Sequence, residues 1–255
     1  MELIIAANWK MHKTVAETVD FCRAILQNEA LFKDVEVLIC PPFTALPAAS
    51  DLLRGSSIKL GAQNMHWERE GAFTGEISAP LLLDLGVEYV IIGHSERRQL
   101  FGEDDSRVQI KMKAALENGL KPILCVGETE AEREEDATEK VIKNQLFVAL
   151  EGLSAEQADS LVVAYEPVWA IGTGKAALPR DAETASSYIN EVIRNKFGKE
   201  AVNKIRIQYG GSVKEDNIGS FAVLSAIQGA LVGGASLEAD TFSALIQAAR
   251  KAVLS

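Results

Sequence analysis

Three side chains that could move a proton or hold a negative charge stand just after short apolar segments. Lys10, His94 and Glu166 each follow, within three residues, a run rich in β-branched and aliphatic residues. An ammonium, an imidazole and a carboxylate can act as acid, base or stabilising donor when they lie together. Taken singly, each has a plainer explanation, because most lysines and glutamates are solvated surface groups. What these residues do therefore depends on the fold that positions them.

Glycine-rich turns follow the last three apolar segments. They lie in the stretches YEPVWAIGTGK from Tyr165, YGGSV from Tyr209 and ALVGGASL from Ala230. A glycine turn can simply reverse the chain, yet glycine also lets backbone N–H groups approach a phosphate closely. The first stretch is not a P-loop, since Trp169 stands where glycine is needed and Ala176 replaces the required serine or threonine. We therefore expect phosphate binding by backbone, with no nucleotide cofactor.

Eight short apolar runs recur along the whole chain, with helical patterns between them. Continuous apolar runs suit strands that are covered on both faces, as in a parallel sheet. The runs are 3–7, 35–40, 58–60, 89–92, 123–126, 161–165, 205–208 and 230–232. This α/β alternation, without a long linker, predicts one closed (β/α)8 barrel of eight parallel strands over residues 1–255, ringed by helices. A doubly wound open sheet is the alternative. In a barrel, the polar residues that follow the strands share one rim.

Apolar residues at helical spacing mark the helix faces that should pack on the core. The stripes are Val15, Val19, Cys22 and Leu26; Ala185, Ile189, Val192 and Lys196; and Phe242, Leu245, Ala249 and Val253. Asp240 is expected to cap the last of these helices. Ser212 and Glu215 form an S-x-x-E capping box for the helix before it.

Composition narrows the class of protein. The chain has 255 residues and a formal net charge of −10, which disfavours nucleic-acid and membrane-surface binding. Its three cysteines, Cys22, Cys40 and Cys125, are widely spaced and form no CxxC motif, which is typical of reduced thiols in a cytoplasmic protein. We expect no signal peptide and no transmembrane helix. No histidine pair at metal-ligand spacing is present, so we expect no metal.

Six motifs together resemble one family. NWK, GAQN, GHSERR, YEPVWAIGTGK, YGGSV and ALVGGASL, in this order, are similar to those of the triosephosphate isomerase family, and the resemblance covers the whole chain. It implies a TIM barrel that interconverts dihydroxyacetone phosphate and D-glyceraldehyde 3-phosphate through an enediol(ate), in glycolysis and gluconeogenesis. It implies no cofactor.

The resemblance also implies roles for individual residues. Glu166 would be the base, with His94 and Lys10 as electrophiles and Asn8 as a further donor. Asn8 and Lys10 would also bind the substrate, and its phosphate would be held by Gly172, Ser212, Gly233 and Gly234. The supporting residues would be Ser95, Glu96, Ile171 and Leu231. A positive charge at a helix start opposes the helix dipole, so we expect His94 to be neutral. Desolvation beneath a closed lid over 169–178 should raise the pKa of Glu166.

The loop from Trp67 to Gly75 is long for a barrel connection. By resemblance it packs on a second copy of the chain in a homodimer, with Thr74 reaching towards the partner's Lys10 and helical arms that expose Met11 and His12 beside it. The sequence alone also allows a floppy excursion.

Two rival functions fit parts of the pattern. Lys10 could form a Schiff base in an aldolase, and the scaffold could bind phosphate without catalysis. A binder has no use for a base such as Glu166, which argues against the second. The run Lys175-Ala176-Ala177-Leu178 lacks the threonines common at this lid hinge, which bears on lid kinetics and not on the reaction.

Overall fold

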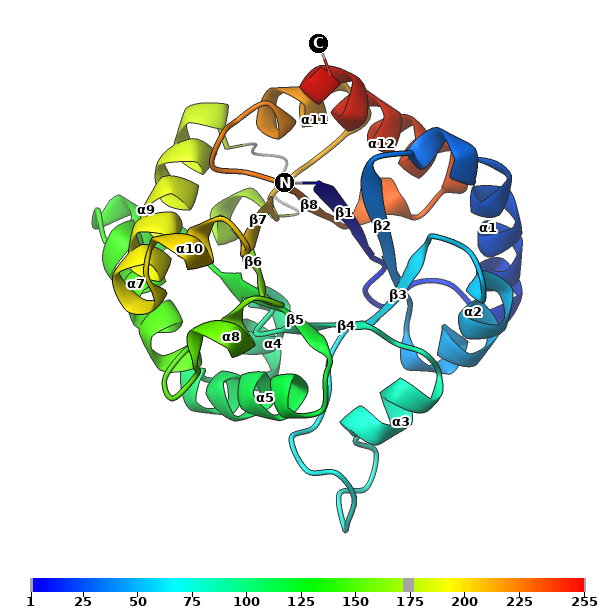
Figure 1. Ribbon diagram of the computed structural model, residues 1–255, viewed down its shortest axis with the longest axis horizontal. Coiled ribbons are helices and arrows are strands. Elements are labelled where there is room, and N and C mark those ends of the chain that lie inside the picture. Colours follow the sequence, from blue (N-terminus) through cyan, green and yellow to red (C-terminus); the bar gives the residue numbers. More distant parts are fainter. Residues whose placement is uncertain (1, 172–176, 255) are drawn as a thin grey trace.

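Eight parallel strands close into a barrel in the order in which they occur along the chain (Figure 1). The computed structural model describes residues 2–171 and 177–254. β1 pairs with both β2 and β8, so the sheet is closed and the predicted barrel is confirmed over the open sheet. The strands are β1 (Leu3–Asn8), β2 (Val35–Cys40), β3 (Lys59–Ala62), β4 (Tyr89–Ile92), β5 (Lys121–Val126), β6 (Val162–Tyr165), β7 (Arg206–Tyr209) and β8 (Gly229–Val232).

Helices surround the barrel, and short 3-10 turns join several of them to the strands (Figure 1). The α-helices are α1 (Val15–Gln27), α2 (Leu46–Leu53), α3 (Ala79–Asp84), α4 (Ser95–Phe101), α5 (Asp105–Glu117), α6 (Glu130–Glu134), α7 (Thr138–Ala149), α8 (Ala155–Ala158), α9 (Pro179–Phe197), α10 (Lys199–Val202), α11 (Glu215–Ala222) and α12 (Ala239–Leu254). The 3-10 turns are η1 (Glu29–Phe32), η2 (Phe43–Ala45), η3 (Val168–Ala170) and η4 (Gly234–Ser236). None of the helices in the described ranges is both long and apolar enough to cross a membrane.

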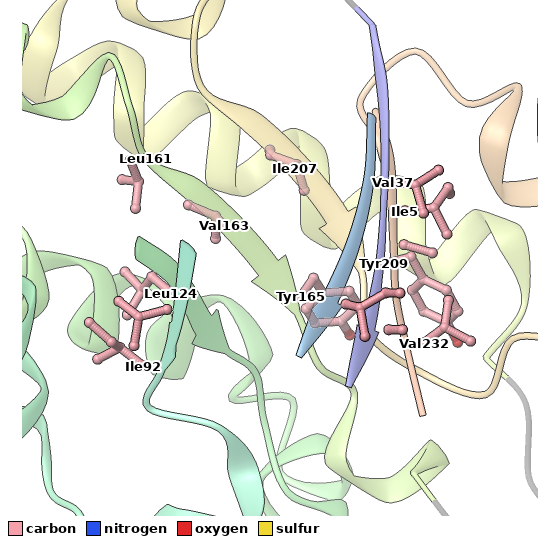
Figure 2. Packing of buried hydrophobic residues seen from close by; sticks show 14 of the residues in the cluster. Ile5, Val37, Ile92, Leu124, Leu161, Val163, Tyr165, Ile207, Tyr209 and Val232 are labelled. Atoms are coloured by element: carbon pink, nitrogen blue, oxygen red, sulfur yellow. The ribbon is translucent and has the colours of Figure 1, made fainter. Parts of the chain in front are cut away.

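The core has two layers, because successive strand residues point to opposite faces of the sheet. Inside the barrel, one cluster is built from strand residues alone, including Ile4, Leu38 and Ile123. Outside it, a larger cluster joins the strands to the helices, and Figure 2 shows part of this layer, with Ile5 and Val163 among its members. The strands are thus apolar on both faces, which is why they were recognisable as continuous runs.

The predicted helix faces are partly wrong. In α1 the buried side chains are Thr18, Phe21, Cys22 and Ile25, so the core-facing side is rotated from the predicted stripe and Val15 is exposed. The α9 and α12 stripes hold at Ala185 and Ile189 and from Phe242 to Ala249, and Lys196 is exposed, as expected for a residue that ends its stripe. Val253 is exposed, against the prediction. A pattern that counts only apolar residues does not detect a buried polar residue such as Thr18.

Both predicted helix starts are wrong. Asp240 lies inside the first turn of α12, which begins at Ala239. The Ser212–Glu215 capping box does not form: α11 begins at Glu215, and Asn217 Oδ1 accepts the Lys214 N–H at 2.8 Å. The Ser212 carbonyl instead accepts from Asn217 Nδ2 at 3.2 Å.

Candidate active site

A cavity of about 840 Å³ opens at the rim of the barrel. It brings together residues from five different strand ends, as expected for the carboxyl-terminal face of such a barrel. The predicted site residues that line it are Asn8, Lys10, His94, Glu166, Ile171, Ser212, Leu231, Gly233 and Gly234. Ser95 and Glu96 lie behind this lining and contact Glu166 and Lys10, respectively. Gly172 and the rest of segment 172–176, which is half of the predicted lid, lie outside the described residues.

Glu166 and His94 form a buried pair at the centre of the cavity. Glu166 is 2% exposed and His94 5% exposed. Glu166 Oε1 lies 3.0 Å from His94 Nε2, and the Ser95 backbone N–H donates to Oε2 at 2.9 Å. Both carboxylate oxygens are therefore held by fixed donors, which aims the group from the end of β6 across to the start of α4.

The pKa of Glu166 reflects two opposed influences. Burial raises it, but the His94 ring, the Ser95 N–H and the Lys10 charge outweigh burial and hold the pKa of the carboxyl below its ordinary value. The predicted rise concerns Glu166 beneath a closed lid and stays a prediction; in the geometry described here, His94 is a direct neighbour and lowers the pKa. The carboxylate is ionised and ready to accept a proton.

His94 has a defined protonation pattern in this geometry. It is the N-cap of α4, and its Nδ1 accepts the Glu96 backbone N–H at 3.2 Å. Nδ1 is thus unprotonated and Nε2 carries the hydrogen that points at Glu166, as in a neutral ring. Burial lowers the pKa of the imidazole, but the Glu166 charge raises it above its ordinary value. The hydrogen bonds fit the expected neutral ring, whereas the charge of the neighbouring Glu166 carboxylate favours the protonated ring.

Lys10 is held by both its side chain and its backbone. Its Nζ donates to Glu96 Oε1 at 2.7 Å, and its own N–H donates to Asn8 Oδ1 at 3.1 Å. The backbone φ of Lys10 is +53°, a left-handed conformation that costs a side-chain-bearing residue roughly 1–2 kcal/mol. Gln63 Nε2 donates to the Lys10 carbonyl at 2.9 Å and so stabilises this conformation. Gln63 belongs to the GAQN motif, but its role escaped the sequence reading.

The glycine turn after β8 lies close to Lys10. A Cβ on Gly233 would stand 3.5 Å from Lys10 Cε, so the Gly233 backbone and the Lys10 side chain lie close together. Gly234 begins η4, whose first N–H groups have no carbonyl partner within the helix. The buried Trp9 indole donates to the Ser236 carbonyl at 3.1 Å, which ties this turn to the segment that carries Lys10. Backbone donors and one ammonium group therefore share this end of the cavity.

Comparison with known proteins accords with this geometry. A family model described as triosephosphate isomerase matches residues 3–249. The chain belongs to the triosephosphate isomerase family. The triosephosphate isomerase of Alkaliphilus metalliredigens is 55% identical over 243 residues, which cover 95% of this chain and 98% of that one. The enzyme of Carboxydothermus hydrogenoformans is 52% identical over 243 residues, covering 95% and 97%. A crystal structure of triosephosphate isomerase from Bartonella henselae has a TM-score of 0.88 at 39% identity, covering 98% and 100%.

Some residues that shape this triosephosphate isomerase family site have no motif that would reveal them. Glu128, fully buried after β5, accepts from the Trp169 indole at 2.8 Å and from the Tyr165 hydroxyl at 3.2 Å. Burial raises the pKa of Glu128. Its contacts fix the start of the 169–178 segment beside Glu166. In the sequence, the signal for Glu128 is a glutamate next to a glycine at the end of a strand.

The potential metal ligands in the described part of the chain do not form a cluster. Within residues 2–171 and 177–254, no group of three or more His, Cys, Asp and Glu side chains is arranged to hold a metal ion. The three cysteines are free and buried, as expected for reduced thiols.

Proposed function

We propose that the chain interconverts dihydroxyacetone phosphate and D-glyceraldehyde 3-phosphate through an enediol(ate), in glycolysis and gluconeogenesis. The observation that carries this proposal is the buried Glu166 carboxylate, 3.0 Å from the His94 imidazole in a cavity that Lys10 also lines. Removing a proton from carbon beside a carbonyl requires a base and donors for the oxygen that becomes negative. The pair and the ammonium group supply both.

In the proposed reaction, Glu166 takes the proton from the carbon next to the carbonyl. The electron pair of that C–H bond forms the new C=C bond, and the carbonyl oxygen becomes the enediolate oxygen. His94 Nε2–H, Lys10 and Asn8 donate to the substrate oxygens and stabilise this charge. A proton then moves from the adjacent hydroxyl oxygen to the enediolate oxygen, and Glu166 returns the abstracted proton to the neighbouring carbon, which yields the other isomer. Ser95 and Glu96 would position Glu166 and Lys10.

The phosphate would bind at the glycine turns after the last three strands. Ser212, Gly233 and Gly234 line the same cavity as the base and offer backbone N–H groups. Gly172 would add a fourth donor. Ile171 and Leu231 border the cavity beside Glu166 and would exclude water from it. Binding energy from this non-reacting group would be used to hold the reacting carbons in place.

Lys10 is a poor candidate for a Schiff-base lysine. Its Nζ donates to the Glu96 carboxylate at 2.7 Å, which is the contact of an ammonium group. A Schiff-base lysine must attack a carbonyl carbon through Nζ, and the Glu96 contact already occupies this atom. The aldolase alternative therefore has no support in this geometry.

We further propose that two copies of the chain form a homodimer through the loop from Trp67 to Gly75. This loop projects away from the barrel between β3 and α3 (Figure 1). Phe73 is 42% exposed and Met11 94% exposed, and apolar side chains at such levels of exposure favour a covered surface. His66 stacks on Trp67 and Phe73 with ring centroids 4.1 and 4.4 Å away, so the loop has a rigid base. Thr74 at its tip would approach the partner's Lys10 segment.

We also infer a cytoplasmic setting and one domain over residues 1–255. Three free, buried cysteines suit a reducing compartment. The barrel uses β1 at one end of the chain and α12 at the other, which favours a single folding unit. The net charge of −10 disfavours nucleic-acid and membrane partners.

The test is interconversion of the two triose phosphates by the purified chain and by Glu166→Gln. We expect the substitution to lower kcat by about 10²–10⁴-fold, because the amide cannot accept the proton. Glu191→Gln, an exposed glutamate on α9, is the control and should keep full activity. Equal turnover by the intact chain and Glu166→Gln would remove Glu166 from its role. No turnover by the intact chain would refute the function.

A further inference from the structure

A glutamine on α7 forms hydrogen bonds with the backbone of Gly127, a residue that lies against Glu166. Gln145 Oε1 accepts the Gly127 N–H at 2.8 Å, and Gln145 Nε2 donates to the Gly127 carbonyl at 3.3 Å. One side-chain amide thus pairs with both polar groups of one residue, as a neighbouring strand would. Gln145 is half-buried on the outer side of the barrel and does not border the cavity.

Gly127 needs such a partner because the sheet ends just before it. The last pair between β5 and β6 joins Val126 to Tyr165, and the Glu166 N–H donates to the Val126 carbonyl at 2.8 Å. Gly127 is buried yet lies beyond this ladder. A buried backbone group without a partner is costly, so the Gln145 amide replaces the missing strand at this point.

Gly127 in turn lies directly against the backbone of Glu166. A Cβ at Gly127 would lie 1.9 Å from the Glu166 carbonyl oxygen and 2.6 Å from its carbon, so no other residue fits without moving Glu166. The next residue continues the contact, since the Val168 N–H donates to the Glu128 carbonyl at 3.0 Å. The position of Gly127 therefore sets the position of the Glu166 backbone.

We infer that Gln145 is a positioning residue for Glu166: its amide fixes Gly127, and Gly127 fixes the peptide from which the carboxylate reaches into the cavity. This inference rests on the proposed function, in which Glu166 is the base. Loss of the clamp lets the end of β5 withdraw, and Glu166 shifts from Ser95 and His94. The phosphate donors Ser212, Gly233 and Gly234 follow β7 and β8, on the far side of Glu166 from this contact, and stay in place.

Kinetics of Gln145→Met test the inference, because methionine keeps the length and bulk of the side chain without its amide. We expect kcat to fall about 10- to 100-fold, the cost of a misplaced catalytic group, while KM for dihydroxyacetone phosphate changes by less than about twofold. The acid limb of the kcat/KM profile should move to higher pH, because the Ser95 and His94 contacts that lower the pKa of Glu166 are loosened. Gln145→Glu keeps the acceptor for the Gly127 N–H and loses only the donor, so an intermediate loss is expected; it also decides the question should Gln145→Met not fold.

Leu146→Ala is the matched control on the same helix. Leu146 is fully buried and belongs to the outer core layer, so its truncation lowers stability. It should leave kcat and the pH profile near those of the intact chain. If both Gln145 variants keep full kcat in an active enzyme, or if Leu146→Ala reproduces their kcat loss and pH shift, the inference is overturned while the proposed function stands. An intact chain without isomerase activity would overturn the proposed function itself.

Discussion

Two opposing influences act on a single carboxylate at the centre of the site. His94, the Ser95 amide and Lys10 lower the pKa of Glu166 more than burial raises it. A substrate that enters between Glu166 and His94 would break their 3.0 Å contact. The lowering influence of His94 would then weaken, so the pKa of Glu166 would move upward and the carboxylate would become a stronger base. The geometry thus favours an ionised base before binding and a more basic one after it.

The same coupling predicts the behaviour of His94 in a variant. Burial lowers the pKa of the ring, and the Glu166 charge is the strongest opposing influence. In Glu166→Gln the charge is gone, so we expect the pKa of His94 to fall below its value in the intact chain. The measurement is an NMR titration of the histidine ring nitrogens. Glu96→Gln removes a smaller raising influence and should cause a smaller fall; an unchanged titration in Glu166→Gln would contradict the coupling.

Residues of the site were predictable where they directly follow a strand. Lys10, His94 and Glu166 stand within three positions of an apolar run, so barrel geometry alone brings them to one rim. Gln63 and Gln145 were not predictable in their roles. Each acts through its side chain on a backbone group distant in sequence, and no local pattern encodes such a contact.

At the scale of elements, a buried ionic cluster joins β4, α4 and α5 behind His94. Glu103 Oε1 accepts the Gly93 N–H at 3.1 Å, and its Oε2 accepts from Lys111 at 2.5 Å and Arg97 at 2.7 Å. Glu103 and Lys111 are both about 4% exposed. Burial raises the pKa of Glu103, but the Lys111 and Arg97 contacts outweigh it and hold the pKa below its ordinary value. The cluster thereby fixes the turn that leads into His94.

We predict that Glu103→Gln destabilises the fold by about 3–5 kcal/mol at pH 7, because it leaves the Lys111 ammonium buried without its counter-charge. Since folding depresses the pKa of Glu103, its stabilising contribution is complete above the unfolded pKa of about 4.3 and is lost as the pH falls through the folded value. The difference from the intact chain should therefore shrink below about pH 4. Urea unfolding between pH 7 and pH 3 at fixed protein concentration measures it. A difference that is constant across this range would contradict the ionic role.

Strand interiors were predicted more reliably than helix starts. β2 and β4 have the predicted bounds, and the remaining strands differ by one or two residues at one or both ends. Burial on both faces of a strand leaves a continuous apolar run, which is easy to detect. Helix starts depend on individual hydrogen bonds. The T-x-x-E box of Thr14 and Glu17 does form and begins α1, whereas the similar box at Ser212 does not.

At the scale of the whole molecule, the barrel presents the site on one rim and the projecting loop at its side. β1 carries Lys10 into the cavity, and the exposed Met11 follows it directly. The segment that supplies the ammonium group is therefore continuous with an exposed apolar surface. Covering that surface with a second copy would restrict the movement of Lys10, which already has a left-handed backbone. Assembly and catalysis should thus be linked.

Phe73→Asp tests this link. Withdrawing a phenyl ring from an interface forfeits about 1.5–3 kcal/mol, and each 1.4 kcal/mol weakens association tenfold, so we expect at least a tenfold to hundredfold rise in the dimer dissociation constant. Phe147→Asp is the control, because Phe147 is 62% exposed on α7, away from the loop. Analytical ultracentrifugation should show a dimer for the intact chain and for Phe147→Asp. Phe73→Asp should shift to monomer on dilution and lose activity in parallel. An intact chain that sediments as a monomer with full activity would refute both the homodimer and its link to Lys10.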